Sequence, residues 1–165
     1  MATTIGRMRT ASTFAARLVD FLRRREAPVV VDLRTTRQRD GDEGEMLARR
    51  HLEAQGLRFV DRNLRYRDGE LDLVMRDDGG ANGVPVIVFV EVRRRAGSSH
   101  GGALASVTSG KRRRLVAAAT RYLGSLGLRT PPPCRFDLVT IDGDVVLSVA
   151  WHRDAFRADV RGDSR

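Results

Sequence analysis

Hydrophobic and polar residues alternate along this chain in two different periods, which predict strands and helices in a definite order. Runs of β-branched and aromatic residues predict strands, whereas apolar residues spaced three and four apart predict helices. The predicted helices cover residues 41–55 and 103–126, and the predicted strands cover residues 57–66, 69–76, 84–95, 135–141 and 145–151. Helices and strands mixed in this order predict an α/β fold.

The two strands within residues 69–95 flank a turn rich in Gly, Asp and Asn, so a hairpin is the simplest interpretation. Residues 86–92 are apolar on both faces, which indicates a central buried strand. Alternate side chains share a face, so Glu70 and Asp72 project together, as do Glu91 and Arg93. A loop centred near residue 80 would place Glu91 opposite residues 70–72 on the partner strand.

This hairpin gathers charge at the end of a core strand. A carboxylate in such a place is costly to desolvate unless a cation meets it. Asp72 and Glu91, with Glu70 and a basic side chain nearby, form the kind of oxygen-rich group that a hard divalent metal ion requires. The alternative is an amphipathic hairpin whose polar face carries ordinary solvated charges.

The first predicted helix opens at Gly41 and stops at Gly56. Glu45 lies at the edge of its apolar arc, from which it can reach toward whatever the helix packs on. Alternatively, Glu45 is an acid near the helix N-terminus that favours the helix dipole. The inward arc comprises Leu47, Ala48, His51, Leu52 and Ala54.

The second predicted helix carries the basic run Lys111, Arg112, Arg113 and Arg114 at or near its start. Cations there oppose the helix dipole and repel one another, and a bound phosphate would relieve both penalties. The alternative is a solvated basic face. The inner face of this helix is marked by Val107, Leu115, Ala118, Ala119, Tyr122, Leu123 and Leu126.

Composition narrows the class of protein. A length of 165 residues fits one domain, and a net charge of +9 favours polyanionic partners, with nucleic acid ahead of membrane. Lys111 is the only lysine among the 30 basic residues, so the placement of arginine says more than its abundance.

The single cysteine, Cys134, excludes an internal disulfide and a thiolate zinc cluster. It fits a reducing compartment, and its side chain is expected to be packed. No apolar run approaches the roughly 18–20 residues of a membrane span.

The ends of the chain differ from its middle. Residues 1–40 contain nine arginines and four acids, and we expect a flexible basic arm that adds nonspecific affinity for nucleic acid. A tail without function is the alternative. The folded domain is expected over residues 41–157, followed by a disordered tail at 158–165.

From Gly41 to Phe156 the chain resembles the YraN family of small bacterial proteins, usually described as predicted endonucleases. That resemblance implies a restriction-endonuclease-like, PD-(D/E)XK core with a mixed sheet flanked by helices, similar to archaeal Holliday junction resolvases. The landmarks that carry it are Gly44-Glu45 with Ala48, Leu52 and Gly56; Asn63-x-Arg65; Gly69-Glu70-x-Asp72-Leu73; Phe89-Val90-Glu91-Val92; Val107 with Lys111; and Arg135-Phe136-Asp137.

The resemblance also implies roles for site residues. Glu45 becomes the helix-borne acid of a catalytic site, while Asp72 and Glu91 become ligands of Mg²⁺ or Mn²⁺, with the backbone carbonyl of Val92 as a further oxygen. The usual lysine of the family is Arg93 here. Arginine is wider than lysine and stays charged near neutral pH, so this departure bears on catalysis more than on fold.

The expected function is metal-dependent hydrolysis of phosphodiester bonds in DNA, in preference to RNA, with branched or flapped DNA in repair or recombination as candidate substrates. A homodimer and a cytoplasmic, bacterial location are expected. The alternatives are a weak or inactive nucleic-acid-binding protein of the same fold and a docking subunit of a DNA-processing complex. The residues expected to grip phosphates are Arg94, Arg95, Lys111, Arg112, Arg113 and Arg114.

Overall fold

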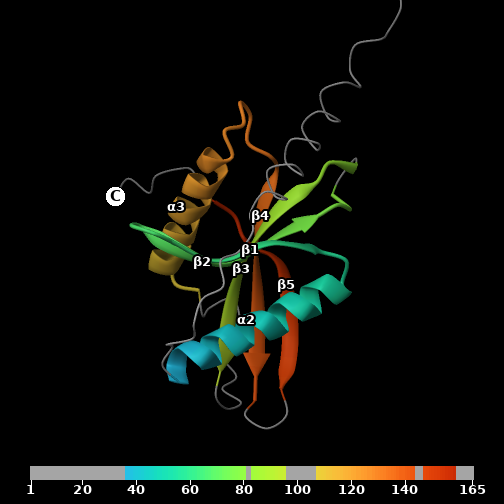
Figure 1. The fold of residues 1–165 in the computed structure, drawn as a ribbon, viewed down its shortest axis with the longest axis vertical. Coiled ribbons are helices and arrows are strands. Elements are labelled where there is room, and N and C mark those ends of the chain that lie inside the picture. The colour runs from blue at the N-terminus through green and yellow to red at the C-terminus, as the bar shows by residue number, and fades with distance from the viewer. Residues whose placement is uncertain (1–35, 81–82, 96–106, 144–146, 159–165) are drawn as a thin grey trace, which may run out of the picture.

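A mixed sheet of five strands in the order β1-β2-β3-β4-β5 organises the chain (Figure 1). The computed structural model describes residues 36–80, 83–95, 107–143 and 147–158. Neighbouring strands are antiparallel except β3 and β4, which are parallel. The predicted α/β class with a mixed sheet is confirmed. The strands are β1 (Arg58–Tyr66), β2 (Gly69–Asp77), β3 (Val86–Arg95), β4 (Cys134–Asp142) and β5 (Ser148–Phe156).

Two helices, α2 (Thr36–Ala54) and α3 (Ser109–Ser125), cover opposite faces of this sheet. Figure 1 shows α2 running across β3, β4 and β5. The helix α3 is part of the crossover that joins the parallel strands β3 and β4, as such a connection requires. Each helix therefore buries its apolar arc against one face, and the hydrophobic core is split into two layers.

The strand β3 supplies both layers of the core, as its apolar sequence predicts. Ile87 and Phe89 pack in the layer under α3, whereas Val88 and Val90 pack in the layer under α2, and none of the four is more than 1% exposed. Because α3 and α2 pack on opposite faces of the sheet, both faces of this middle strand are covered. The prediction of a central buried strand is confirmed.

Several predicted boundaries are wrong. The helix α2 begins at Thr36 rather than Gly41, since each of its two glycines, Gly41 and Gly44, costs only about 1 kcal/mol inside a helix. The predicted stop at Gly56 is right, with a φ of 92° that favours glycine. The strand β5 begins at Ser148 and continues past Trp151 to Phe156, whose ring stacks on Phe136.

Two predicted core positions are also wrong, because Ala54 and Cys134 are exposed. Ala54 is the last residue of α2, and Cys134 opens β4 at the margin of the sheet. The predictions for residues 1–35 and for residues 159–165 lie outside the described residues, as does the side chain of Arg95. Within the ranges that are described, no helix is both long and apolar enough to cross a bilayer.

Candidate functional site

The hairpin of β2 and β3 opens at one end, and the candidate site lies there. Regular pairing runs from Asp77 opposite Val86 to Leu73 opposite Val90 and then stops. Continued by one step, the register would place Asp72 opposite Glu91, as the predicted loop position requires. Instead of a backbone carbonyl, the carboxylate of Asp72 accepts the N–H of Val92, at 2.9 Å.

The strand β2 changes direction at the same place. Leu71 packs in the layer under α3, whereas Leu73 packs in the layer under α2, although residues two apart in a regular strand share a face. Asp72, which lies between them, is the first residue of β2 beyond the regular pairing with β3. The irregularity turns the end of the hairpin into a cleft instead of extending the sheet.

This acidic cleft has a volume of about 240 Å³ and draws on four elements. The helix α2 contributes Glu45, β2 contributes Asp72, and β3 contributes Glu91 and Arg93, while Lys111 reaches in from α3. The structure therefore brings together all the predicted catalytic residues. The complete lining is Gly41, Gly44, Glu45, Glu70, Asp72, Glu91, Val92, Arg93, Arg94 and Lys111.

Glu91 is the most deeply buried of these carboxylates, with only 2% of its side chain exposed. Its Oε1 lies 3.1 Å from Nε of Arg93, and its Oε2 lies 3.3 Å from Nζ of Lys111. Burial and the charge of Asp72 nevertheless raise the pKa of Glu91 to about 7, because together they outweigh the two cations. The expectation that a cation meets the carboxylate at the end of β3 is confirmed twice over.

Asp72 and Glu91 disfavour each other's ionised form. Burial raises the pKa of Asp72, and neighbouring Glu70 raises it further, whereas the Val92 N–H, Lys111 and Arg93 oppose the shift. Two carboxylates that share a buried space can both ionise readily only when positive charge is added between them. The pair is therefore suited chemically to a cation of higher charge than a single ammonium group.

Glu45 faces this pair from α2. Burial, Asp72 and Asp42 raise its pKa to about 7, and Arg62 and a hydrogen bond from the Asn63 side chain only partly oppose that shift. Its Oε2 is buried and has no hydrogen-bond partner among the described residues. Because α2 begins at Thr36, Glu45 lies in the middle of the helix, so its interpretation as an acid near the helix N-terminus is wrong.

Sequence reasoning missed Asn63 as a site residue. It has a φ of 53° within β1, in the left-handed region that asparagine tolerates better than most residues with a side chain. The strand is irregular nearby, since its register with β2 shifts between Phe59 and Asp61. An asparagine inside an otherwise strand-like run was the available signal, and its consequence is a hydrogen bond to Glu45.

Lys111 belongs to the carboxylate cluster. Its side chain is 17% exposed, and Nζ lies 3.2 Å from Oε1 of Glu70 as well as beside Glu91. Thr108 caps α3 by accepting the Lys111 N–H at 3.3 Å, which fixes where this side chain leaves the helix. Burial would lower the pKa of Lys111, but Glu91, Asp72 and Glu70 raise it above its ordinary value.

The other predicted phosphate-gripping residues whose side chains are described form no ion pair with the acids of the cleft, whereas Lys111 does. The Nε of Arg112 donates to the Val107 carbonyl at 3.1 Å, and its guanidinium lies 5.6 Å from the Phe156 ring centre. Arg94, Arg113 and Arg114 are exposed. The basic run is therefore not one patch, because its first member points into the acidic cleft and the others stay at the surface.

The donor set fits a magnesium-type ion as an open site. Mg²⁺ is commonly held by one or two carboxylates together with water and substrate oxygens, and Asp72, Glu91 and the carbonyl of Val92 supply that chemistry. Among the described residues, no three His, Cys, Asp or Glu side chains are arranged around one ion position. Glu45 therefore does not complete a closed ligand set in this arrangement.

Comparisons with known proteins agree with the resemblance found in the sequence. A family model described as "Uncharacterised protein family UPF0102" matches residues 44–141. A UPF0102 protein of Dechloromonas aromatica is 52% identical over 119 residues, which is 72% of this chain and 89% of the relative. Another, from Xanthomonas euvesicatoria, is 50% identical over 123 residues, covering 74% and 95% of the two chains. The chain therefore belongs to the UPF0102 family, the family of YraN that its sequence resembles.

Proposed function

We propose that this protein is a metal-dependent phosphodiesterase that acts on DNA. The observation that carries the proposal is the convergence of Glu45, Asp72 and Glu91, from three elements, in one cleft with Arg93 and Lys111. Burial holds the pKa of each of these acids above its ordinary value. Groups perturbed in this way and gathered in a cleft are typical of catalytic sites.

Asp72 and Glu91 would hold the Mg²⁺ or Mn²⁺ ion, with the Val92 carbonyl as a further oxygen. When bound, such an ion activates a water molecule and neutralises charge that develops on the scissile phosphate. Both oxygens of Glu91 now contact cations, Arg93 and Lys111. One role of these two residues is therefore to stabilise the buried carboxylates when no metal is bound.

Lys111 can supply the positive charge that the usual lysine of the family would supply at the position of Arg93. Its ammonium group is compact, half-buried and adjacent to Glu91. Because the surrounding acids raise its pKa, Lys111 stays protonated and acts by its charge, not as a general base. Arg93 is also permanently charged, so both residues would stabilise negative charge on phosphate oxygens.

Glu45 is the acid best placed to exchange a proton near neutral pH, because its pKa is about 7 and one of its oxygens is buried without a hydrogen-bond partner among the described residues. It would orient the attacking water and accept its proton. Asn63 and Arg62 would act as positioning residues, since they are the groups that favour the charged form of Glu45.

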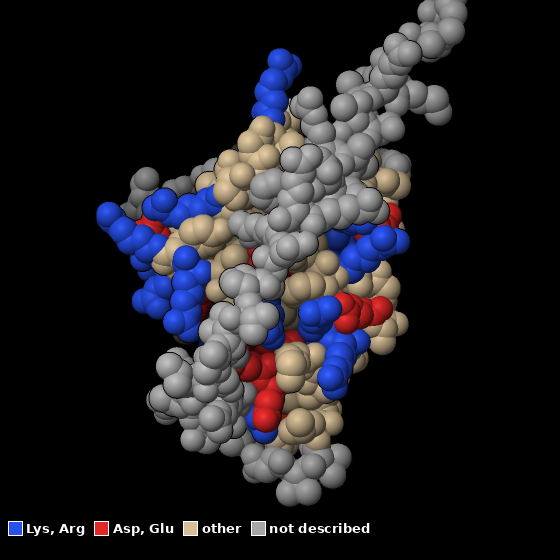
Figure 2. Space-filling model, viewed as in Figure 1, with Lys and Arg blue, Asp and Glu red and all other residues tan. Residues whose placement is uncertain are grey.

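Nucleic acid is the proposed substrate class because the chain carries a net charge of +9, and exposed arginines such as Arg94 border the cleft. Figure 2 shows Lys and Arg side chains gathered on the side of the molecule where α3 lies in Figure 1. The preference for DNA, branched or flapped, and the proposed homodimer rest on the resemblance to restriction-endonuclease-like enzymes and junction resolvases. A cytoplasmic location is proposed on the same grounds.

A second candidate is a nucleic-acid-binding protein that does not cleave. Two observations favour it: arginine replaces the family lysine at position 93, and both oxygens of Glu91 already contact cations. A metal would have to loosen one of these ion pairs in order to use Glu91 fully. If the metal cannot loosen these ion pairs, the cleft would bind no metal, and the protein would bind DNA without cleaving it.

One assay distinguishes the two candidate functions, DNA cleavage and DNA binding without cleavage. Linear, nicked and four-way DNA are incubated with wild type, Asp72→Asn and Glu91→Gln, with and without Mn²⁺. We expect cleavage by wild type only with Mn²⁺, loss of cleavage in both variants, and DNA binding that is retained or tighter. Glu53→Gln, which changes an exposed acid on α2, is the matched control and should cleave like wild type. Cleavage at the wild-type rate in both variants would overturn the site, while binding without cleavage would establish the second candidate.

A further inference from the structure

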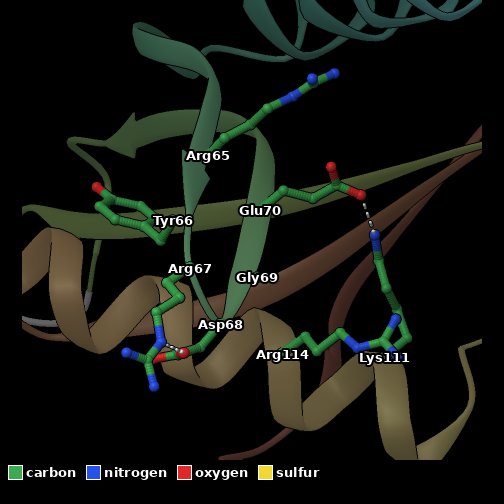
Figure 3. Close-up of a pocket in the computed structure, with 8 residues that line it drawn as sticks. All are labelled: Arg65, Tyr66, Arg67, Asp68, Gly69, Glu70, Lys111 and Arg114. Carbon is green, nitrogen blue, oxygen red and sulfur yellow. Dashed lines mark hydrogen bonds and ion pairs between the residues drawn. The ribbon is translucent and has the colours of Figure 1, made fainter.

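A second hollow adjoins the acidic cleft, between the turn that joins β1 to β2 and the first turns of α3 (Figure 3). We call it the basic groove. Its volume is about 610 Å³, and it shares Glu70 and Lys111 with the acidic cleft. A chain bound in one could therefore continue into the other. The basic groove is lined by Arg65, Tyr66, Arg67, Asp68, Gly69, Glu70, Lys111 and Arg114.

The walls of the basic groove are held together by a close backbone contact. A Cβ atom at Gly69 would collide with the backbone carbonyl of Arg114, so the absence of a side chain lets the turn pack directly on α3. This contact fixes Arg67 and Asp68 on the turn opposite Arg114 and Lys111 on the helix, as Figure 3 shows. The groove is thus built by two packed elements, and its cations are presented from both sides.

Positive charge exceeds negative charge in the basic groove. Both of its acids already have cationic partners: Asp68 pairs with Arg121 and lies 3.6 Å from Arg67, and Glu70 pairs with Lys111. No described carboxylate forms an ion pair with Arg65 or Arg114. These two guanidinium groups can therefore bind an anion without first releasing a described carboxylate partner.

We propose that the basic groove binds the backbone phosphates of the nucleic-acid strand that leads away from the acidic cleft. This inference rests on the proposed function, because a phosphodiester in the cleft must continue into the rest of its strand. Four carboxylates line the cleft, whereas the adjoining groove offers arginine forks that match phosphate oxygens. Lys111 lies where the two meet, so it can serve the scissile phosphate on one side and its neighbour on the other.

Recognition in the basic groove should not depend on base sequence. Of its lining residues, Tyr66 is the aromatic one, and its side chain packs against the core layer under α3. It is therefore not a free platform for stacking bases. Arginines that contact phosphates position a strand but do not read its bases.

The test measures binding separately from cleavage. Asp72→Asn serves as the background, without divalent metal, and binding to labelled single-stranded and duplex DNA of scrambled sequence is followed by fluorescence anisotropy across a range of NaCl concentrations. In this background the groove variant combines Arg65→Gln, Arg67→Gln and Arg114→Gln. The matched control combines Arg58→Gln, Arg129→Gln and Arg157→Gln, which removes the same charge from exposed positions outside the groove. Equal melting temperatures verify that both variants fold.

We expect the groove variant to reduce the slope of log K against log salt by about 0.7 for each phosphate that it no longer neutralises on single strands, and by about 0.9 on duplex DNA. The control should change the slope much less, and scrambling the DNA sequence should change neither result. Equal slopes in the groove and control variants would overturn the inference. So would a background protein that binds no DNA at low salt, and preferential capture of an acidic peptide would then reassign the groove to a protein partner.

The result is independent of the cleavage assay. Wild type that cleaves DNA while its groove variant keeps the original salt slope would refute the groove and preserve the enzyme. A groove variant with a reduced slope in a protein that never cleaves would refute the enzyme and preserve the groove.

Discussion

Two carboxylates on the same strand, Asp72 and Asp77, have pKa values that the fold shifts in opposite directions. Asp77 accepts hydrogen bonds from Nη1 of Arg135 at 2.7 Å, from Nη2 of Arg153 at 3.0 Å and from the N–H of Gly79 at 2.9 Å. Burial would raise its pKa, but these donors lower it below the ordinary value. For Asp72, burial outweighs the opposing groups and the pKa is raised.

Asp137 on β4 extends the satisfied group around Asp77. It is fully buried and accepts hydrogen bonds from Nε of Arg135 at 3.0 Å, from Nε1 of Trp151 at 3.0 Å and from the N–H of Asp154 at 2.9 Å. Buried acidic side chains thus occur at both ends of the sheet, with Glu91 at one end and Asp77 and Asp137 at the other. What distinguishes the candidate site is that burial outweighs the groups around its carboxylates and raises their pKa, which is a reason to assign it function and to assign Asp137 to structure.

The largest expected effect concerns stability at the satisfied end. Asp137→Ala should lower the free energy of unfolding by about 3–5 kcal/mol, because it removes one of the two carboxylates paired with Arg135 and leaves the Trp151 and Asp154 donors without their acceptor. Asp72→Asn should not destabilise the protein, since an amide oxygen can still accept the Val92 N–H. Urea unfolding followed by circular dichroism checks both. Similar losses in the two variants would remove the distinction between the ends of the sheet.

The next effect concerns the cation of the acidic cleft. Lys111→Gln should lower the cleavage rate about 100-fold, or roughly 2.7 kcal/mol of barrier, because the charge beside Glu91 and the phosphate is removed. Arg157→Gln, which removes a charge from an exposed arginine outside the cleft, should leave the rate unchanged. Single-turnover rates with Mn²⁺ separate this loss from weaker DNA binding. A rate within twofold of wild type would show that Lys111 is structural.

A third effect sharpens the comparison through pH. The pKa of Glu91 is about 7 in the folded protein and ordinary, near 4.5, in the unfolded chain, so the folded state favours the protonated acid. The stability that the protonated Glu91 contributes to wild type is fully present below the unfolded pKa of 4.5, and it is lost as pH rises toward the folded pKa of about 7. Glu91→Gln should therefore be more stable than wild type by about 1–3 kcal/mol at pH 8 without metal, and similar at pH 4.5.

Asp77→Asn is the counterpart of that experiment. The pKa of the wild-type Asp77 carboxyl group is lowered in the folded protein. Its contribution to stability is therefore present above the unfolded pKa and is lost as pH falls below that pKa. Asp77→Asn should therefore be destabilised most near neutral pH. Relative to wild type, the stability of Glu91→Gln should change as pH rises from 4.5 to 8, whereas that of Asp77→Asn should change only as pH falls below the ordinary value of 3.8. Parallel pH profiles would contradict the assignment of the two ends.

The smallest predicted effect is at Arg93. Arg93→Lys should raise the cleavage rate about tenfold, near 1.4 kcal/mol, because a compact ammonium fits between Glu91 and a phosphate more closely than a planar guanidinium. Arg93→Ala should lower the rate, and DNA affinity should change little in Arg93→Lys. A wild type faster than Arg93→Lys would show that arginine is the adapted residue here.

The sequence predicts most of the hairpin and its carboxylate pair. Alternation with a period of two and the position of the loop place Asp72 opposite Glu91, and both are properties of a short segment. The approach of Lys111 depends on how α3 returns across the sheet, and this cannot be read from the basic run in which it lies. Asn63 is 18 positions from Glu45, and Trp151 and Asp154 are 14 and 17 positions from Asp137, so the sequence did not show which acid would gain its hydrogen-bond donors. Asn63 was visible as part of a family landmark and as an asparagine within a strand-like run, but neither signal shows that it contacts Glu45.

Binding of Mn²⁺ tests the central claim most directly. Isothermal titration at pH 8 should reveal one site in wild type and in Glu53→Gln, and none in Asp72→Asn. Affinity should fall at pH 6, because Glu45 and Glu91, each with a pKa of about 7, must release protons before the cleft accepts a divalent ion. Wild type that binds no Mn²⁺ at pH 8, or Asp72→Asn that binds it as tightly as wild type, would contradict the account.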